Sequence, residues 1–239
     1  MTNHTQSMQD RSRVWQLLAL AFAHPLPELH QQLADGRFQS ALDQAIAGAF
    51  GGASANLPLA STSFRDFEAQ YITLFDIGPK GRPLVPLCAG GYESLLGGQG
   101  RPRLMLQYAR FYGHFGLKTP DGDAEHEMPD HLTCQLECLA WLSHLEGRAV
   151  GRGEQTQGYR QAQDDFITRL LRPQCRILVS RLSQNCAQRG YDLLFAALGE
   201  ALEQVLALYL GDSRTTHDLA APSPLSQSMA SGQAQNLWG

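Results

Sequence analysis

The chain has 239 residues, of which 43% are hydrophobic and 18% are charged, and its formal net charge at pH 7 is −4. A chain of this length can bury a substantial core in one large domain or two small ones. Its 19 basic and 23 acidic residues form no Lys/Arg cluster, which argues against a nucleic-acid-binding protein. No apolar run approaches the length of about 18 residues that a membrane span requires, and the polar N-terminus argues against a signal peptide.

The chain contains five cysteines, and none of them forms a Cys-x-x-Cys pair. An odd number of cysteines without paired spacing does not fit a disulfide scaffold. The simplest interpretation is that the thiols are reduced and that the protein is cytoplasmic.

The N-terminal part of the chain is predicted to form short amphipathic helices. Apolar residues recur three and four positions apart from Val14 to Phe22 and stop before Pro25, as expected for a helix that buries one face. Ser63, with Asp66 three residues later, is typical of a residue that caps the N-terminus of a helix. In chain order the predicted elements are helices at 14–22, 28–33, 38–46 and 64–75, with a loop at 51–62.

A glycine- and proline-rich segment occupies residues 76–102, with seven glycines, four prolines and no periodic pattern. A segment of this length without regular structure in a compact domain is usually either functional or disordered. Its glycine clusters do not match the Gly-x4-Gly-Lys-Ser/Thr phosphate loop and do not follow a predicted strand. The sequence therefore offers no support for nucleotide hydrolysis. A helix is predicted to restart at Pro102.

The second half of the chain contains the helix that we expect to be the most deeply buried. From Leu132 onward two apolar stripes run along the sequence, which indicates burial over a wide arc, as in the central helix of a bundle. This helix is predicted to end near Gly147, and the stretch 147–158 is typical of a linker or hinge. Further helices are predicted at 159–171, 173–189 and 191–210, and residues 212–239 are predicted to form a disordered tail.

No strand pair and no internal repeat is evident, so the sequence predicts an all-α fold. We expect a single helical-bundle domain over residues 1–211. The sequence does not decide between a monomer and a homodimer. The apolar pair Leu237-Trp238 in the polar tail either has no function or is a short docking element.

The most informative segment is Glu127-Met128-Pro129-Asp130-His131-Leu132, which opens the central helix. Pro129 is tolerated in a first helical turn, and the helix dipole favours a carboxylate at Asp130. One interpretation is therefore structural, with a charge that stabilises the helix and a histidine that is hydrogen-bonded to a neighbouring loop. The other is functional, with Glu127 and Asp130 as an acidic patch that receives arginine side chains of a bound peptide, since an arginine–carboxylate contact can be bidentate.

The same segment resembles the signature of the TorD/DmsD/NarJ group of molybdoenzyme maturation chaperones. Three other segments resemble motifs of that group and occur in the expected order, within about residues 60–145. These segments are Tyr71-Ile72-Thr73-Leu74-Phe75, Pro86-Leu87-Cys88-Ala89-Gly90-Gly91-Tyr92-Glu93-Ser94 and Arg110-Phe111-Tyr112-Gly113-His114-Phe115-Gly116-Leu117. The second segment departs from the group's pattern, because Gly90-Gly91 stand where a proline is often found. This departure suggests a branch that serves dehydrogenases or oxyanion reductases.

The resemblance implies a TorD-like fold and a system-specific chaperone that has no cofactor and is not an enzyme. It also implies that a homodimer, if one forms, can arise by exchange of the half beyond the hinge. Such a chaperone would bind the apo catalytic subunit of a molybdenum-containing oxidoreductase, its client, and hold it until the cofactor is inserted. Where the client carries a twin-arginine signal peptide, the chaperone would bind that peptide and delay export. The residues expected to form the client site are Glu127, Asp130 and Glu93 for a basic segment, Tyr71, Phe75 and Leu132 for an apolar segment, and His131 and Tyr92.

Several alternatives stay open. Tyr92 is equally well explained as an aromatic anchor that holds the loop on the helices. His131, Cys134 and Cys138 project from one helix face and are residue types that zinc prefers, so a small metal-binding enzyme is an alternative, although no fourth ligand is evident. A permanent accessory subunit of a redox complex is another. For the chaperone, replacement of both Asp130 and His131 by alanine is expected to weaken client binding and to leave the fold intact.

Overall fold

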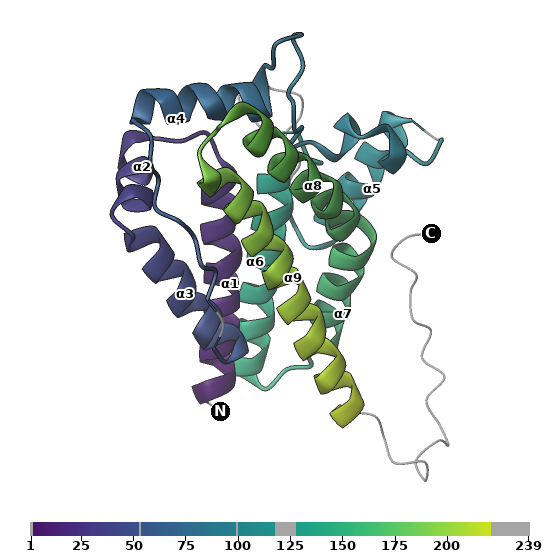
Figure 1. The fold of residues 1–239 in the computed structure, drawn as a ribbon. Coiled ribbons are helices and arrows are strands. Elements are labelled where there is room, and N and C mark those ends of the chain that lie inside the picture. Colours follow the sequence, from purple (N-terminus) through teal and green to yellow (C-terminus); the bar gives the residue numbers. More distant parts are fainter. Residues whose placement is uncertain (1, 53, 99, 118–127, 221–239) are drawn as a thin grey trace.

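The computed structural model describes residues 2–52, 54–98, 100–117 and 128–220, which form a bundle of helices (Figure 1). Within these residues there is no strand, and the one isolated antiparallel bridge joins Cys88 and His131. The predicted all-α fold is confirmed. The elements are α1 (Thr2–Phe22), α2 (Pro27–Ala34), α3 (Arg37–Phe50), α4 (Phe64–Tyr71), the π-helical turn η1 (Ile72–Asp76), the 3-10 turns η2 (Ala89–Gly91) and η3 (Glu93–Leu95), α5 (Arg101–His114), α6 (Leu132–Arg152), α7 (Gln157–Phe166), the π-helical turn η4 (Ile167–Leu171), α8 (Arg172–Arg189) and α9 (Leu193–Ala220).

The long helices α1 and α6 lie side by side in the middle of the bundle, and of the described elements they share the most extensive contact (Figure 1). The apolar stripe of α6 is buried as predicted, since Leu136, Leu139 and Leu142 have no exposed surface. The hydroxyl of Ser12 on α1 donates to the carbonyl of Ala140 across this interface at 2.9 Å. Helices α3 and α9 pack on α1, and α7 packs on α6.

The helix α6 continues past Gly147, where the sequence predicted its end. A Cβ atom at Gly147 would lie 3.1 Å from the Cβ of Met8, so the glycine allows α1 to approach closely and does not break the helix. Gly153, with a φ of 69°, ends the helix in the left-handed conformation that glycine favours. The connection to α7 is therefore only residues 153–156, shorter than the predicted hinge at 147–158.

The helix α9 packs against α8 and α3. Gly190 follows α8 in the left-handed conformation, as the sequence predicted for this position.

Among the described residues one helical stretch is long and apolar enough to cross a membrane, namely Leu193–Asp212 of α9, with a mean hydropathy of 1.6. Half of this stretch is buried in the bundle, and a core helix meets the same criteria, so it is weak evidence for a membrane span.

The helix α9 reaches Ala220 and so extends beyond residue 212, where the sequence predicted the start of a disordered tail. An ion pair between Arg11 of α1 and Asp212 connects this part of α9 to the rest of the bundle. Arg11 is almost fully buried, and its guanidinium also lies over the ring of Tyr209, 5.5 Å from the centroid. The remainder of the predicted tail, with the Leu237-Trp238 pair, lies outside the described residues.

The turn between α8 and α9 is held by the buried carboxylate of Asp192. Its Oδ2 accepts hydrogen bonds from the backbone N–H groups and the hydroxyls of Ser61 and Thr62, at distances of 2.8 to 3.2 Å. Its Oδ1 accepts the N–H of Leu194 at 3.0 Å and so caps α9. The backbone N–H of Asp192 donates to Oε1 of Gln70 on α4 at 2.7 Å. Asp192 thus connects the α8–α9 turn to residues 61–70, more than 120 residues earlier in the chain.

We expect the free energy of unfolding to decrease at acidic pH, in part because the Asp192 carboxylate becomes protonated. Burial alone would raise the pKa of Asp192, but the hydrogen bonds from Leu194, Ser61 and Thr62 outweigh burial and hold the pKa below its ordinary value. The folded chain therefore binds this proton more weakly than the unfolded chain does. Its contribution to stability is complete above the unfolded pKa of about 3.9 and is lost as the pH falls through the lower folded pKa.

Asp192→Asn is accordingly expected to lower the free energy of unfolding at neutral pH by about 1–2 kcal/mol, because charge-assisted hydrogen bonds become neutral ones. The variant should also lose less stability than the wild type between about pH 5 and about pH 3, as measured by urea unfolding. Asp35→Asn is the matched control. The pKa of Asp35 is also lowered, first by the backbone N–H of Arg37, but this carboxylate is exposed. Equal losses in the two variants would contradict the role assigned to Asp192.

Candidate functional site

The glycine- and proline-rich loop folds against the N-terminal end of α6. The N–H of Ala89 donates to the carbonyl of Asp130 at 3.0 Å, and the N–H of Leu132 donates to the carbonyl of Leu87 at 2.9 Å. These two hydrogen bonds bracket the isolated antiparallel bridge. The structure thus brings together two of the segments that resemble the chaperone group.

Two buried glutamines extend this connection to α8. Nε2 of Gln135 on α6 donates to the carbonyl of Asp130 at 2.9 Å and to Oε1 of Gln174 on α8 at 2.7 Å. Gln174 in turn donates to the carbonyl of Leu87 in the loop at 2.7 Å. Both glutamine residues are fully buried, where a missing hydrogen bond is costly. Sequence reasoning missed both residues, because a single glutamine on a helix belongs to no motif and no apolar stripe.

The sequence predicted Asp130 in the first helical turn. In the structure it lies in the turn that precedes α6. It is fully buried, so it does not contribute to an exposed acidic patch in this conformation. Its Oδ2 accepts the N–H of Gly90 at 2.7 Å, and its Oδ1 lies 3.9 Å from Nη2 of Arg101. A Cβ atom at Gly90 would lie 2.9 Å from Oδ2, so the glycine lets the loop approach the carboxylate closely. The departure from the chaperone pattern at this position is therefore in direct contact with Asp130.

His131 caps the N-terminus of α6. Its Nδ1 accepts the backbone N–H of Thr133 at 3.3 Å and lies 2.7 Å from the Thr133 hydroxyl. A cap of this kind satisfies one of the N–H groups that have no partner within the helix. The histidine is also partly exposed, so the structural and the functional interpretation of this residue are compatible.

Of the two cysteines on α6, Cys138 lies in the core, whereas Cys134 is partly exposed. Among the described residues, no group of three His, Cys, Asp or Glu side chains is placed to hold a metal ion, and this includes His131, Cys134 and Cys138. Cys138 is buried, and burial raises the pKa of its thiol well above the ordinary value. A metal ligand would have to be a thiolate. The five cysteines, all within the described part of the chain, form no disulfide.

Tyr92 holds the loop in place. Its hydroxyl donates to the carbonyl of Pro86 at 2.7 Å, and its ring lies under the guanidinium of Arg181 on α8, 4.9 Å from the centroid. A Cβ atom at Gly91 would lie 2.5 Å from the Cβ of Pro86, so the loop needs glycine there in order to fold back on itself. These contacts favour the interpretation of Tyr92 as an anchor. Glu93, the next residue, is exposed.

The residues predicted to receive an apolar segment of the client lie in the core. Tyr71, Phe75 and Leu132 are all buried, so in this conformation they line no surface. The hydroxyl of Tyr71 donates to the carbonyl of Phe22 at the end of α1, at 2.9 Å. The spacing of these apolar residues predicted that they share one face of a helix. Spacing alone does not distinguish a face that packs in the core from one that lines a binding groove. Glu127 lies outside the described residues.

Comparison with known proteins identifies the relatives of this chain. A sequence profile of the nitrate reductase delta subunit family matches residues 21–179. The chain belongs to this family. The dimethyl sulfide dehydrogenase assembly chaperone protein of Rhodovulum sulfidophilum is 36% identical to it over 234 residues, which cover 95% of this chain and 91% of the relative. The perchlorate reductase assembly chaperone protein of Dechloromonas aromatica is 34% identical over 67% of this chain and 72% of the relative. The selenate reductase assembly chaperone protein of Thauera selenatis is 34% identical over 57% and 66%. No solved structure shows a significant match.

Membership of the nitrate reductase delta subunit family confirms the resemblance to the TorD/DmsD/NarJ chaperones. The three relatives are named assembly chaperones and not enzymes, so this family member is a chaperone and not an enzyme. One relative is named for a dehydrogenase and two for reductases of oxyanions. These are the two classes that the Gly90-Gly91 departure suggested for its branch.

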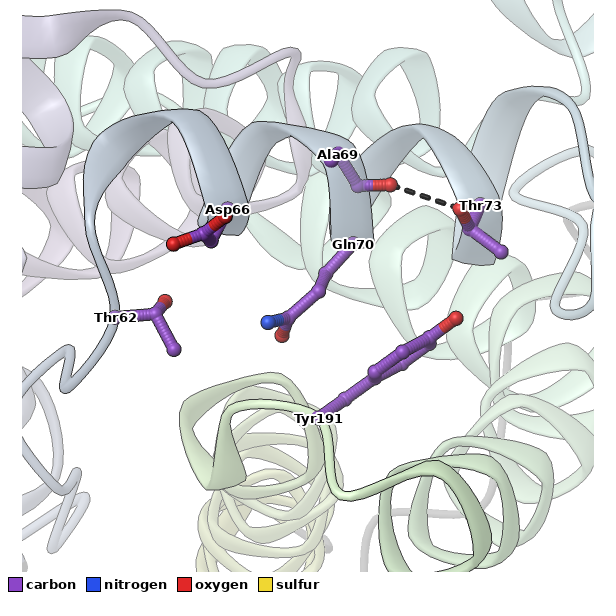
Figure 2. Close-up of a pocket in the computed structure, with 6 residues that line it drawn as sticks. All are labelled: Thr62, Asp66, Ala69, Gln70, Thr73 and Tyr191. Atoms are coloured by element: carbon purple, nitrogen blue, oxygen red, sulfur yellow. Dashed lines mark hydrogen bonds between the residues drawn. The ribbon is translucent and has the colours of Figure 1, made fainter.

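A surface groove of about 420 Å³ lies between α4 and the α8–α9 turn (Figure 2). The residues that line it are Thr62, Asp66, Ala69, Gln70, Thr73 and Tyr191. Four of them already use polar groups within the chain. Thr62 donates to Asp192, and Asp66 accepts the Ser63 hydroxyl at 2.7 Å. Gln70 accepts the N–H of Asp192, and the Thr73 hydroxyl donates to the carbonyl of Ala69 at 2.8 Å. No residue of the predicted client site lines the groove, and we do not assign it to client binding.

Proposed function

We propose that this delta-subunit family member binds the apo catalytic subunit of a molybdenum-containing oxidoreductase in the cytoplasm and holds it until the cofactor is inserted. The names of the relatives support a client of the same kind as dimethyl sulfide dehydrogenase or the oxyanion reductases. The observation that carries the proposal is the buried carboxylate of Asp130. Its Oδ1 has no hydrogen-bond partner among the described residues, and it lies in the segment that resembles the chaperone signature.

A basic peptide followed by an apolar one supplies the groups that this site lacks. Arginine side chains of a twin-arginine signal peptide would bring N–H donors to the Asp130 carboxylate. Of the residues predicted for the site, His131 is partly exposed, and Glu93 is exposed in the loop that folds against the N-terminal end of α6. Met128 is 44% exposed and offers an adaptable apolar contact. A signal peptide held in this way would be hidden from the export machinery, which delays export.

Capture of the tagged full-length chain from its native cells tests the proposal. The expected result is co-elution of one molybdoenzyme catalytic subunit that retains its signal sequence and lacks the cofactor, as shown by mass spectrometry and molybdenum analysis. Co-elution of the mature, cofactor-loaded enzyme would favour a permanent accessory subunit. Absence of any such subunit would contradict the proposal.

Two variants that each remove one exposed negative charge test the client site. Glu93→Gln is expected to weaken client binding roughly two- to fivefold, because an exposed charge at the rim of an interface contributes modestly. Glu200, which is exposed on α9, provides the matched control, and Glu200→Gln is expected to leave the affinity unchanged. Quantitative capture of the same client by both variants measures the difference. Equal effects would place Glu93 outside the client site.

A further inference from the structure

Arg101 covers the buried carboxylate of Asp130 without being firmly bonded to it. The closest approach is 3.9 Å, from Nη2 of the arginine to Oδ1 of the aspartate, and Oδ1 accepts no hydrogen bond from any described residue. The arginine side chain is 48% exposed, whereas the aspartate side chain has no exposed surface. In a tight pair the nitrogen–oxygen distance is about 2.7–2.9 Å, and two hydrogen bonds are common. The guanidinium is therefore held loosely.

The position of Arg101 is not explained by the helix that begins with it. It is the first residue of α5, where the helix dipole disfavours a positive charge, and the first turn contains no acidic residue. Arg103 adds a second positive charge to the same turn. Gly90 in the neighbouring loop leaves room for the guanidinium, because a Cβ atom there would lie 3.0 Å from Nε of Arg101. Arg101 thus occupies a space next to Asp130 that the neighbouring loop leaves open at Gly90.

Three buried polar atoms in this region have no hydrogen-bond partner among the described residues. They are Oδ1 of Asp130, Oε1 of Gln135 and the hydroxyl of Tyr108. The amide nitrogen of Gln135 is 2.9 Å from the carbonyl oxygen of Asp130. Burial first, and the charge of Asp130 second, raise the pKa of Tyr108, which is consistent with a hydroxyl close to the carboxylate. All three atoms can accept a hydrogen bond, and a guanidinium carries five N–H donors in a planar arrangement.

We propose that Arg101 is an internal substitute for an arginine of the client. In the client-free chain its guanidinium covers the Asp130 carboxylate. On binding, a guanidinium of an extended peptide displaces it and donates to the acceptors that lack a partner. This inference rests on the proposed function and adds to it a competition between an internal and an external arginine. It entails a preference for arginine over lysine, since an ammonium group cannot supply the planar set of donors.

The test uses the purified full-length chain and a synthetic peptide with two adjacent arginines followed by apolar residues. A second peptide, with lysines in place of both arginines, is the ligand control. Arg101→Gln removes the internal competitor and is expected to tighten binding of the arginine peptide about two- to fivefold, as follows from release of an exposed ion pair. The lysine peptide is expected to bind more weakly to both proteins. Titration calorimetry measures these affinities.

Arg103→Gln is the matched protein control, because it removes the same charge from the same helical turn. We expect it to leave the affinity for the arginine peptide within about twofold of the wild type. In an Asp130→Asn background, where a neutral amide replaces the carboxylate, Arg101→Gln is expected to have no effect. The inference is overturned by equal gains in both backgrounds, by an equal gain from Arg103→Gln, or by a loss of affinity in Arg101→Gln. Unfolding of Arg101→Gln would also overturn it, because the arginine would then be a structural partner.

Failure of this inference and failure of the proposed function give different results. If neither the wild type nor Arg101→Gln binds the arginine peptide while the catalytic subunit is still captured from cells, the competition is wrong and the proposed function stands. If the peptide affinities change as expected and no catalytic subunit is captured, the arginine site stands and the client belongs to another class of protein.

Discussion

Glu146→Ala is expected to lower the free energy of unfolding by about 3–5 kcal/mol, because it leaves a largely buried guanidinium without its counter-charge. Glu146 on α6 is fully buried. Its Oε1 accepts hydrogen bonds from Nη2 of Arg160 on α7 at 2.9 Å and from Nε at 3.2 Å, and its Oε2 accepts from Gln163 at 2.9 Å. The side chain of Arg160 is only 18% exposed. The midpoint of thermal unfolding should fall by about 6–20 °C, as calorimetry can measure.

Glu154→Ala is the control for this substitution. Glu154 lies 3.8 Å from Arg152, and both side chains are more than half exposed, so the loss should not exceed about 1 kcal/mol. Replacement of both buried partners, as Glu146→Met with Arg160→Leu, should cost less than Glu146→Ala because no charge is left uncompensated. If Glu146→Ala is as mild as Glu154→Ala, the ion pair does not hold α6 and α7 together.

The same network bears on the predicted hinge. Ser143 on α6 donates to Oε1 of Gln163 on α7 at 2.9 Å, in addition to the Glu146–Arg160 pair. These bonds hold α6 and α7 together on either side of the short connection at 153–156. Opening of the chain at this point breaks these bonds, and a dimer that exchanges its C-terminal halves forms the same bonds between its two chains. The hinge and the dimer stay predictions.

Asp130→Asn is expected to weaken client binding by about 30-fold or more, the effect of removing the charge from a buried, hydrogen-bonded ion pair. The amide oxygen can still accept the N–H of Gly90, so the loop should keep its position. Titration of the variant with the arginine peptide and capture of the client from cells measure the loss. Asp165→Asn is the control, since Asp165 also pairs with an arginine, Arg169 at 3.6 Å, at a more exposed position on another helix. An affinity equal to that of the wild type would remove Asp130 from the site.

The sequence alone predicted that replacement of both Asp130 and His131 by alanine leaves the fold intact, whereas the hydrogen bonds of the two side chains lead us to expect a loss of stability. Alanine at 130 leaves the N–H of Gly90 without its acceptor, which costs about 1–3 kcal/mol when that group is buried. Alanine at 131 removes the side-chain acceptor for Thr133 and so the cap of α6, at a cost of typically about 1 kcal/mol. Weak binding of the double variant would therefore have two causes. Asp130→Asn separates them.

Much of the architecture could be predicted from local sequence. The apolar stripes of α6 are buried as their spacing indicated, because a helix must bury a wide apolar arc. Ser63 accepts the N–H of Asp66 and caps α4, and Gly190 ends α8, since both positions need a specific local conformation or acceptor. The motif around Asp130 was also located correctly at the start of the central helix. These features depend on residues within one or two helical turns of each other.

Other features were decided only by the tertiary structure. Gln174 bonds to Leu87, 87 residues earlier in the chain, and Gly147 fits against Met8 of another helix. Periodicity indicates which face of a helix is apolar, but not which segment covers it. For the same reason the sequence determined that a carboxylate and a histidine stand at the start of α6. Only long-range packing of the loop and of α5 decided that Asp130 is buried beneath Arg101, whereas His131 stays accessible.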